Sequence, residues 1–334
     1  MIRSFVFVVV FVFFACSGNS ENFSDGGIGV VDGFTEGGPP FVSFTNPDQP
    51  GPYNVGYQGQ SLDTATWGEF PLTVYYPAKI AGKDTDADVS AAPYPLVVFA
   101  HGASSNKDAN TWVCKHLVSW GFVCAMFSTP DPVAGENDQW IYGILGSIDL
   151  LSNQKAPPRG LRNMVSEEQI AAAGHSKGAN AALLAAGQDH RIRAVVALAP
   201  CAGGDLQAGK RIDGAVQLQT AALDGICPSR DCRPYYGILE KPKQFLEIAG
   251  ANHIGFIDQG LYYEAAKMLV EKGSLNDKPA TITRDEQERI SRKYMAAWLT
   301  FHLKGNSEAE DYVYGEPAQT DFSSGVLSAF DFGK

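Results

Sequence analysis

The chain has 334 residues, of which 45% are hydrophobic and 19% are charged, a balance typical of a globular protein with a buried core. Its formal net charge of −11 at pH 7 argues against nucleic acid as a partner. This length suits one large α/β domain or two small ones.

The N-terminus begins with an apolar segment that is too short to span a membrane. Eleven apolar residues run from Phe5 to Ala15 behind Arg3, whereas a transmembrane helix needs about 20. The pattern matches the hydrophobic region of a signal peptide. The residues around Cys16 resemble a bacterial lipobox, except that Phe13 stands where leucine is usual. We therefore predict export with lipidation of Cys16; the alternative is a free cysteine beside an ordinary cleavage site.

Composition divides the chain into three parts. Residues 1–16 form the predicted signal peptide. Residues 17–51 are rich in Gly, Ser, Asn, Asp and Pro, which is typical of a flexible tether. The folded domain is therefore expected over residues 52–334, and any activity of the chain is expected there.

From residue 70 onward, short apolar runs alternate with helical patterns. Several runs are apolar at consecutive positions, as in strands buried on both faces of a sheet. Between two runs, Val113, Leu117 and Trp120 share one helix face that Gly121 ends, and Thr283 begins a capping box before the C-terminal helix. This alternation predicts the α/β class, with a mostly parallel central sheet and helices on both faces. The runs are "FPLTVYYPA", "YPLVVFAHG", "FVCAMFST", "IAAAGHS", "IRAVVALAP", "AVQLQTAAL" and "KQFLEIAG".

The segment "AGHSKGANA" places one serine between two glycines at an expected turn from strand to helix. Residues 174–178 have the G-x-S-x-G form of a nucleophile elbow, in which the serine backbone is strained and the glycines prevent clashes. We therefore predict that Ser176 is a nucleophile. The alternative is a glycine-rich turn with an ordinary capping serine.

A serine nucleophile needs a base and an acid, which are expected at the ends of later strands. His253 lies just past the last apolar run, and Asp224 ends the run before it. In this arrangement the histidine accepts the serine proton and the aspartate orients the histidine. Asp205, Asp213 and Asp231 are rival acids, but none of them ends an apolar run so cleanly.

The tetrahedral intermediate of acyl transfer needs backbone N–H donors for its oxyanion. These are expected at Lys177, directly after Ser176, and at Ala103, in the loop after "YPLVVFAHG". His101 in that loop is expected to be a buried residue that shapes the turn. The Lys177 side chain is expected in solvent, and the His175 ring is expected to point away from the serine hydroxyl.

Five cysteines follow Cys16, and export would permit disulfides among them. The short loop "CPSRDC" favours a Cys227–Cys232 disulfide. The pair Cys114–Cys124 is a weaker candidate, because one member is expected in a helix and the other in the next strand. An odd count leaves at least one thiol unpaired. No C-x-x-C pair and no clustered histidines suggest zinc, so no metal site is expected.

Taken together, these motifs resemble the α/β-hydrolase superfamily. The resemblance is to the branch with cutinase-like polyester hydrolases, chlorophyllases and platelet-activating-factor acetylhydrolase-like esterases. It runs from about Val55 to His302, and the motifs fall in the order of that branch. It implies a serine carboxylesterase without metal or organic cofactor. The motifs are "PLVVFAHG", "LVSWGFVCAMFSTPDP", "GHSKGANAALLA", "AVVALAPC", "AALDGICP" and "GANHIGF".

Two positions depart from the polyester hydrolases that the chain resembles. Those enzymes carry an aromatic residue at the position of Ala103 and a tryptophan at the position of Cys201, and these rings grip aromatic acyl units. Cys201 is thus expected to line the substrate cleft without providing such a ring. The departures favour small soluble esters over aromatic polymers.

The sequence therefore predicts an exported serine ester hydrolase that acts outside the cytoplasm on short-chain or small soluble esters. Its expected partners are a small-molecule ester and, through Cys16, a membrane. Alternatives are a lipase or phospholipase, a cutinase-like polyester hydrolase, a peptidase with the same triad, and a catalytically inactive binding protein at the cell surface.

Overall fold

The structure is a computed structural model that describes residues 43–153, 157–201 and 209–334. The predicted signal peptide, Cys16 and most of the predicted tether lie outside the described residues. The tether ends earlier than residue 51, because Phe44 is buried against Trp120, with 4.8 Å between the ring centroids. The first described residues are thus already part of the folded domain.

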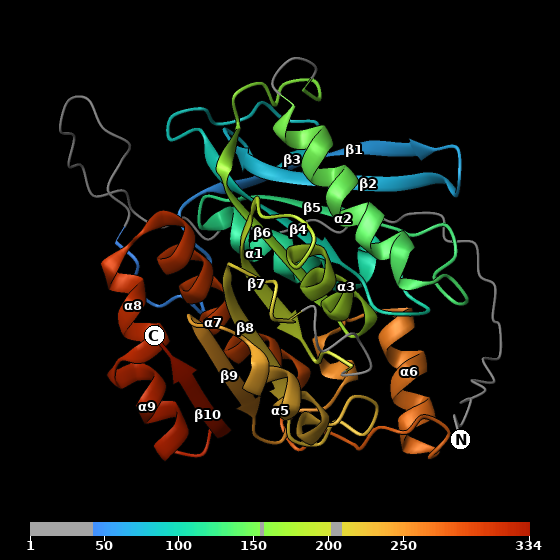
Figure 1. Cartoon of the computed structure of the whole chain (residues 1–334), viewed down its shortest axis with the longest axis vertical. Helices are drawn as coiled ribbons and strands as arrows, with labels where there is room; N and C mark the ends of the chain where they lie inside the picture. Colours follow the sequence, from blue (N-terminus) through green and yellow to red (C-terminus); the bar gives the residue numbers. More distant parts are fainter. Residues whose placement is uncertain (1–42, 154–156, 202–208) are drawn as a thin grey trace. The chain divides into compact units, whose positions relative to one another are not determined.

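A ten-stranded mixed sheet forms the centre of the domain, in the order β10-β9-β8-β7-β6-β4-β5-β2-β1-β3 (Figure 1). The strands from β9 to β5 in this order are parallel, whereas β2 joins β5 antiparallel, β1 pairs antiparallel with β2, and β10 lies antiparallel to β9. The predicted mostly parallel sheet is therefore confirmed. The strands are β1 (Asn54–Thr64), β2 (Gly68–Ala78), β3 (Gly82–Lys83), β4 (Tyr94–Ala100), β5 (Val123–Phe127), β6 (Val165–His175), β7 (Ile192–Leu198), β8 (Ala215–Ala221), β9 (Lys243–Ile248) and β10 (Leu327–Gly333).

Helices cover both faces of this sheet, as predicted. Side chains alternate along each strand, so that Leu96 and Val98 of β4 enter one apolar layer while Val97 and Phe99 enter the other. The first layer is covered by α2 (Asn137–Ser152), α3 (Lys177–Ala186) and α5 (Ser229–Ile238). The second layer is covered by α1 (Thr111–Ser119), α7 (Arg284–Lys304), α8 (Ser307–Tyr314) and α9 (Glu316–Ser323).

Two short 3₁₀ helices and α6 complete the described elements near the carboxyl ends of the parallel strands. The segment η1 (Lys107–Asn110) precedes α1, and η2 (Ile254–Phe256) follows β9. Helix α6 (Leu261–Glu271) packs on η2 through Ala266 and Val270. Half of the predicted capping box is present at α7: the Thr283 hydroxyl accepts from the backbone N–H of Glu286 at 3.2 Å, while the Glu286 carboxylate pairs with Arg289.

A ladder of buried polar side chains lies between β8, β9 and α7. Gln217, Gln219 and Gln244 are fully buried, and so is Ser291 of α7. The Gln217 amide donates to Gln244 Oε1 at 2.6 Å, the Gln219 amide donates to Gln217 Oε1 at 2.7 Å, and the Ser291 hydroxyl donates to Gln219 Oε1 at 2.6 Å. The amide of Gln244 donates to a backbone carbonyl of α8. This glutamine ladder satisfies its buried groups internally.

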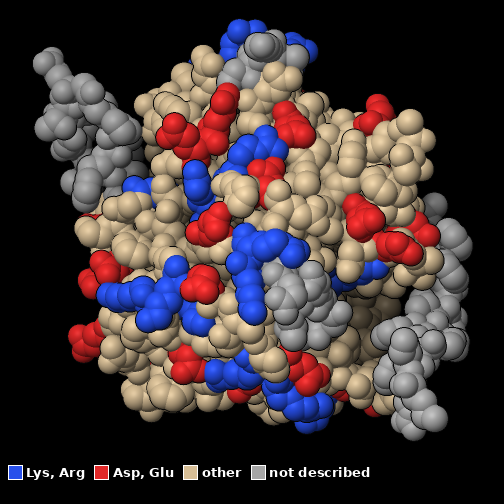
Figure 2. Space-filling model, viewed as in Figure 1, with Lys and Arg blue, Asp and Glu red and all other residues tan. Residues whose placement is uncertain are grey.

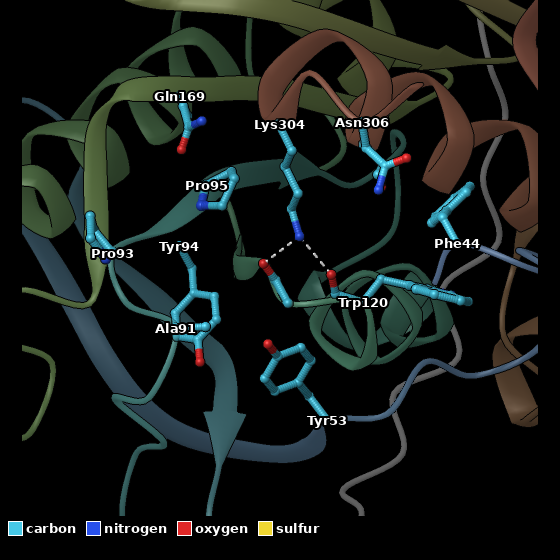
Figure 3. A pocket seen from close by; sticks show the side chains of 12 residues that line it. Phe44, Tyr53, Ala91, Pro93, Tyr94, Pro95, Trp120, Gln169, Lys304 and Asn306 are labelled. Carbon is cyan, nitrogen blue, oxygen red and sulfur yellow. Dashed lines mark hydrogen bonds between the residues drawn. The ribbon is translucent and has the colours of Figure 1, made fainter. Parts of the chain in front are cut away.

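A pocket opens beside the amino end of β4 and the carboxyl end of α1 (Figure 3). Its amine, Lys304 Nζ, donates to the carbonyl oxygens of Trp120 at 2.6 Å and Gly121 at 2.9 Å. These carbonyls lie at the end of α1, and burial lowers the pKa of Lys304 to about 7, so the Nζ acts there as a hydrogen-bond donor. Lys304 therefore stabilises a helix terminus at the end of the sheet opposite to Ser176.

On the face shown in Figure 2, acidic and basic side chains are interspersed rather than gathered by sign. Ion pairs such as Arg191 with Asp149, 2.7 Å apart, are exposed and contribute little to stability. Among the described residues, no helix has the length and apolar character needed to cross a bilayer.

Candidate active site

Ser176 occupies the turn between β6 and α3 with the strained backbone expected for a nucleophile elbow. Its φ of 55° and ψ of −119° lie in a region that few non-glycine residues adopt. A Cβ on Gly174 would overlap the backbone of Gly178, and a Cβ on Gly178 would overlap the carbonyl oxygen of Ala100. Both glycines of the pentapeptide are therefore required by close backbone approach. The Ser176 N–H donates to the Leu198 carbonyl at 2.9 Å, which ties the turn to β7.

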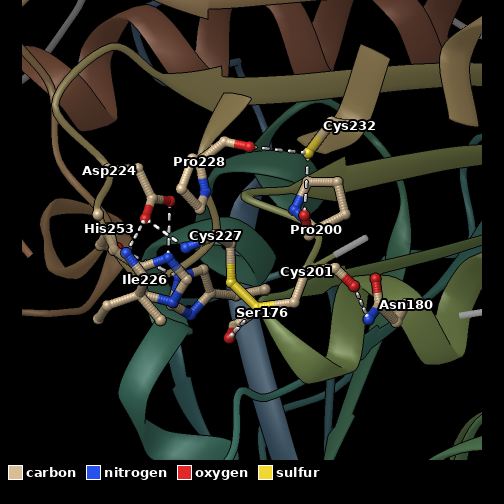
Figure 4. The surroundings of a disulfide bond; sticks show 12 residues. Ser176, Asn180, Pro200, Cys201, Asp224, Ile226, Cys227, Pro228, Cys232 and His253 are labelled. Carbon is tan, nitrogen blue, oxygen red and sulfur yellow. Dashed lines mark hydrogen bonds and ion pairs between the residues drawn. A yellow bond between two sulfur atoms is a disulfide. The ribbon is translucent and has the colours of Figure 1, made fainter. Parts of the chain in front are cut away.

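His253 and Asp224 form a buried hydrogen-bonded pair at the same edge of the sheet. His253 Nδ1 donates to Asp224 Oδ2 at 2.7 Å, and both side chains are almost inaccessible to solvent. The second oxygen of Asp224 accepts from the N–H groups of Ile226 at 2.8 Å and Cys227 at 2.7 Å. These bonds fix the carboxylate and leave His253 Nε2 as the ring atom that can exchange a proton. Figure 4 shows Asp224, His253 and Ser176 among the residues that surround the disulfide of Cys201 and Cys227.

The His175 ring packs against His253 rather than beside the serine hydroxyl. The two ring centroids are 4.7 Å apart, and His175 Nε2 donates to the His253 carbonyl at 3.2 Å. Burial keeps the pKa of His175 well below its ordinary value, and the neighbouring His253 ring lowers it further. His175 is thus a neutral support for the histidine loop.

The loop after β4 closes over the serine, as the sequence predicts. A Cβ on Gly102 would lie 3.3 Å from Ser176 Cβ, so this backbone passes directly beside the nucleophile position. His101 is fully buried; its Nδ1 donates to the Gly102 carbonyl at 2.7 Å and its Nε2 accepts from the Thr129 N–H at 3.1 Å. Burial lowers the pKa of His101 to about 4. His101 is a neutral residue that shapes the loop, and Ala103 follows in the turn.

A scan against protein-family models matches residues 32–271 to the family described as PET hydrolase-like. The chain belongs to the PET hydrolase-like family. This finding confirms the predicted membership of the α/β-hydrolase superfamily beside the cutinase-like polyester hydrolases. A search of curated proteins found no match for the chain.

The cysteine pairing of this PET hydrolase-like chain differs from the favoured prediction. The disulfides are Cys201–Cys227 and Cys114–Cys124, so the predicted Cys227–Cys232 bond is wrong and the weaker candidate is present. Cys232 lies in α5 as a buried free thiol that donates to the Pro200 carbonyl at 3.0 Å. Helix α5 turns Cys232 toward Pro200, whereas Cys227 faces the loop after β7. A short spacing in the sequence could not show this.

Cys201 lies beside Ser176 as one half of a disulfide. Its Sγ lies 3.7 Å from Ser176 Oγ (Figure 4). The bond to Cys227 also joins the loop after β7 to the loop that carries Asp224. Cys201 therefore cannot be replaced without removing this bridge.

The Lys177 side chain departs from its expected place in solvent. Its Nζ donates to the Gly135 carbonyl and lies 4.3 Å from the centroid of the Trp140 ring. Burial lowers the pKa of Lys177. The Lys177 side chain thus anchors the loop before α2. The Lys177 backbone N–H remains the predicted oxyanion donor.

Of the three rival acids, two are placed at the surface. Asp213 pairs with His190 at 2.6 Å, and Asp231 lies 3.7 Å from Arg230, with all four side chains exposed. Asp205 lies outside the described residues. Asp224 is therefore the carboxylate, among these four, that the structure brings to His253. Within the described ranges, no group of three metal-ligating side chains is found.

One buried carboxylate beside His253 was missed by sequence reasoning. Asp277 lies between α6 and α7 and accepts from the N–H groups of Gly225 at 3.1 Å, His253 at 3.4 Å and Ile254 at 3.3 Å. It ends no apolar run and follows the histidine in the chain, so no motif signals it.

Proposed function

We propose that this PET hydrolase-like protein is a serine ester hydrolase whose nucleophile is Ser176. The observation that carries the proposal is the buried His253–Asp224 pair, 2.7 Å apart, at the sheet edge where the strained Ser176 lies. A carboxylate held by two backbone N–H groups orients the imidazole and favours its protonated form during reaction.

In the proposed mechanism Ser176 Oγ attacks the ester carbonyl carbon and His253 Nε2 takes the hydroxyl proton. The carbonyl π electrons move to oxygen, and the N–H groups of Ala103 and Lys177 bind this oxyanion. The intermediate collapses, the C–O bond to the alcohol breaks, and His253 donates the proton to the leaving alcohol. Water then attacks the acyl-enzyme by the same route, releasing the carboxylic acid and free Ser176.

Ser176→Ala tests this function directly. The variant should keep the melting temperature within a few degrees and lose both ester turnover and covalent labelling by a fluorophosphonate, because the attacking oxygen is absent. Ser328→Ala, at an exposed serine of β10, is the matched control and should retain both. Labelling that persists in Ser176→Ala would place the nucleophile elsewhere.

For the substrate we favour short-chain soluble esters. Ala103 and the disulfide-bonded Cys201 place no aromatic ring at these two positions beside Ser176, so neither can stack on an aromatic acyl unit. Polyester hydrolysis is the second candidate, and the family match favours it. Comparing hydrolysis rates decides between the two candidate substrates. The series consists of p-nitrophenyl acetate, butyrate and longer esters, a peptide and an aromatic polyester film. A film degraded as fast as soluble butyrate would overturn the preference.

We also propose that the protein is exported. Two disulfides among the described residues support an oxidising compartment, and the apolar N-terminal segment supports a signal peptide. Attachment of lipid at Cys16 would hold the enzyme at a membrane. Mass analysis of the mature N-terminus tests this, since a chain that begins at lipidated Cys16 is heavier than one that begins at Ser17 by the cysteine residue and its attached lipid.

A further inference from the structure

Asp277 joins the two loops that carry the proposed acid and base. Its Oδ1 accepts from Gly225, which follows Asp224, and also from the N–H of His253; its Oδ2 accepts from Ile254. One carboxylate therefore bridges the turn after β8 and the start of η2. The residue is 8% exposed, so these bonds form out of contact with bulk water.

The segment around Asp277 is fitted closely to both loops. The Asn276 side chain donates to the Gly225 carbonyl at 2.6 Å, and the Asn252 side chain donates to the Lys278 carbonyl at 2.7 Å. A Cβ on Gly225 would lie 2.6 Å from the Asn276 carbonyl oxygen, so only glycine allows this approach. Three consecutive residues, 276–278, thus contact the acid loop or the histidine loop.

The charge of Asp277 also acts on this site. Burial raises the pKa of Asp277, and the nearby Asp224 charge raises it further, whereas the Gly225 bond and a protonated His253 lower it. Around His253, the described titratable groups are Asp224 after β8, the neutral His175 at the end of β6, and Asp277. The facing side chain of α7 is the uncharged Gln287.

We propose that Asp277 is a positioning residue for the hydrolytic site, an inference that rests on the proposed function. By holding the backbone of His253, Ile254 and Gly225, it keeps the His253 imidazole within hydrogen-bond distance of the Asp224 carboxylate. Its negative charge also favours the imidazolium that forms when Ser176 gives up its proton.

The test compares Asp277→Asn with Asp258→Asn. Asp258 is the control, because its carboxylate, like that of Asp277, accepts from backbone N–H groups of another segment. These are the N–H groups of Thr111 at 2.7 Å and Trp112 at 3.2 Å, at the start of α1. Asp277→Asn should lower kcat on p-nitrophenyl butyrate by roughly tenfold or more with little change in KM. The acid limb of its kcat/KM profile should move to lower pH by about half a unit, because one negative charge is removed.

Asp258→Asn should lower the melting temperature yet leave kcat and the acid limb unchanged. If Asp277→Asn behaves in the same way, losing stability alone, the positioning role is refuted. An unchanged Asp277→Asn enzyme also refutes it.

Backbone hydrogen exchange separates failure of this inference from failure of the proposed function. Asp277→Ala should speed exchange in peptides that cover 224–227 and 252–256, while Asp258→Ala should speed exchange at the start of α1 instead. This readout needs no substrate. Wild-type exchange at both segments in Asp277→Ala would overturn the inference even if the enzyme hydrolyses esters. A wild-type protein that neither reacts with fluorophosphonate nor cleaves esters would overturn the function alone.

Discussion

Two buried polar clusters lie in this domain, and they are built in opposite ways. The glutamine ladder sits on regular strands and a helix, and its amides donate to one another and to backbone carbonyls of α7 and α8. The candidate site sits on loops at strand ends, where backbone N–H groups hold Asp224 and Asp277. Its hydroxyl, Ser176 Oγ, faces a sulfur 3.7 Å away, which is a weak partner. The ladder uses its hydrogen-bonding capacity within the protein, whereas the Ser176 hydroxyl has only a weak partner, as the proposed function requires.

The largest expected effect is a loss of activity when the candidate site, rather than the ladder, is changed. Asp224→Asn should reduce kcat on p-nitrophenyl butyrate by about 10⁴-fold, as expected when the supporting acid of a triad no longer fixes the histidine tautomer. Its free energy of unfolding, measured by urea denaturation, should change little, because the amide side chain of the variant keeps the shape of the carboxylate and one acceptor oxygen. A loss of activity below tenfold would contradict the assignment of Asp224.

The next prediction is a loss of stability without a loss of activity. Gln219→Leu should lower the free energy of unfolding by about 2–4 kcal/mol, because Gln217 Oε1 and the Ser291 hydroxyl lose their buried partner. Activity per folded molecule should remain within about twofold. Gln319→Leu, at an exposed glutamine of α9, is the control and should change stability by less than about 0.5 kcal/mol. Loss of kcat in folded Gln219→Leu would show that the clusters are coupled.

The last prediction concerns the change of stability with pH. The ladder amides do not titrate, whereas His101 beside the site has a pKa lowered to about 4 by burial. Its unfolded form binds a proton below about pH 6.5, so stability falls by up to about 1.4 kcal/mol per unit as the pH drops from 6.5 to 4. His101→Gln should reduce that slope in urea unfolding measured across this range, while Gln219→Leu should shift the curve without changing its slope. Parallel curves for wild type and His101→Gln would contradict this.

The parts predicted from the sequence are those that local pattern and chain order determine. The turn around Ser176 follows from a fixed pentapeptide between an apolar run and a small-residue helix. Asp224 and His253 follow from their places after consecutive parallel strands, whose carboxyl ends must meet. The Thr283 capping box likewise depends on residues within one turn.

The parts that were missed depend on contacts between distant loops or on weak local patterns. Strand β1 has mostly exposed or half-buried residues, with only Gly56 and Leu62 buried, and it lacks an apolar run. The partner of Cys227 depends on how the loop after β7 approaches the loop after β8. In the sequence, Asp277 is indistinguishable from other polar loop residues, because only the folded chain brings it to His253. The ladder glutamines fall within predicted strands, and nothing in the sequence indicates that they bond to each other.

The buried thiol of Cys232 has a practical consequence for handling the protein. Thiol–disulfide exchange needs a thiolate, and burial raises the pKa of Cys232 to about 12. At pH 8 only about one molecule in 10⁴ carries that thiolate, so the nearby Cys201–Cys227 bridge is protected from scrambling although a third sulfur lies in the same region. We therefore expect the oxidised protein to keep its disulfides during purification and storage without alkylation or replacement of Cys232.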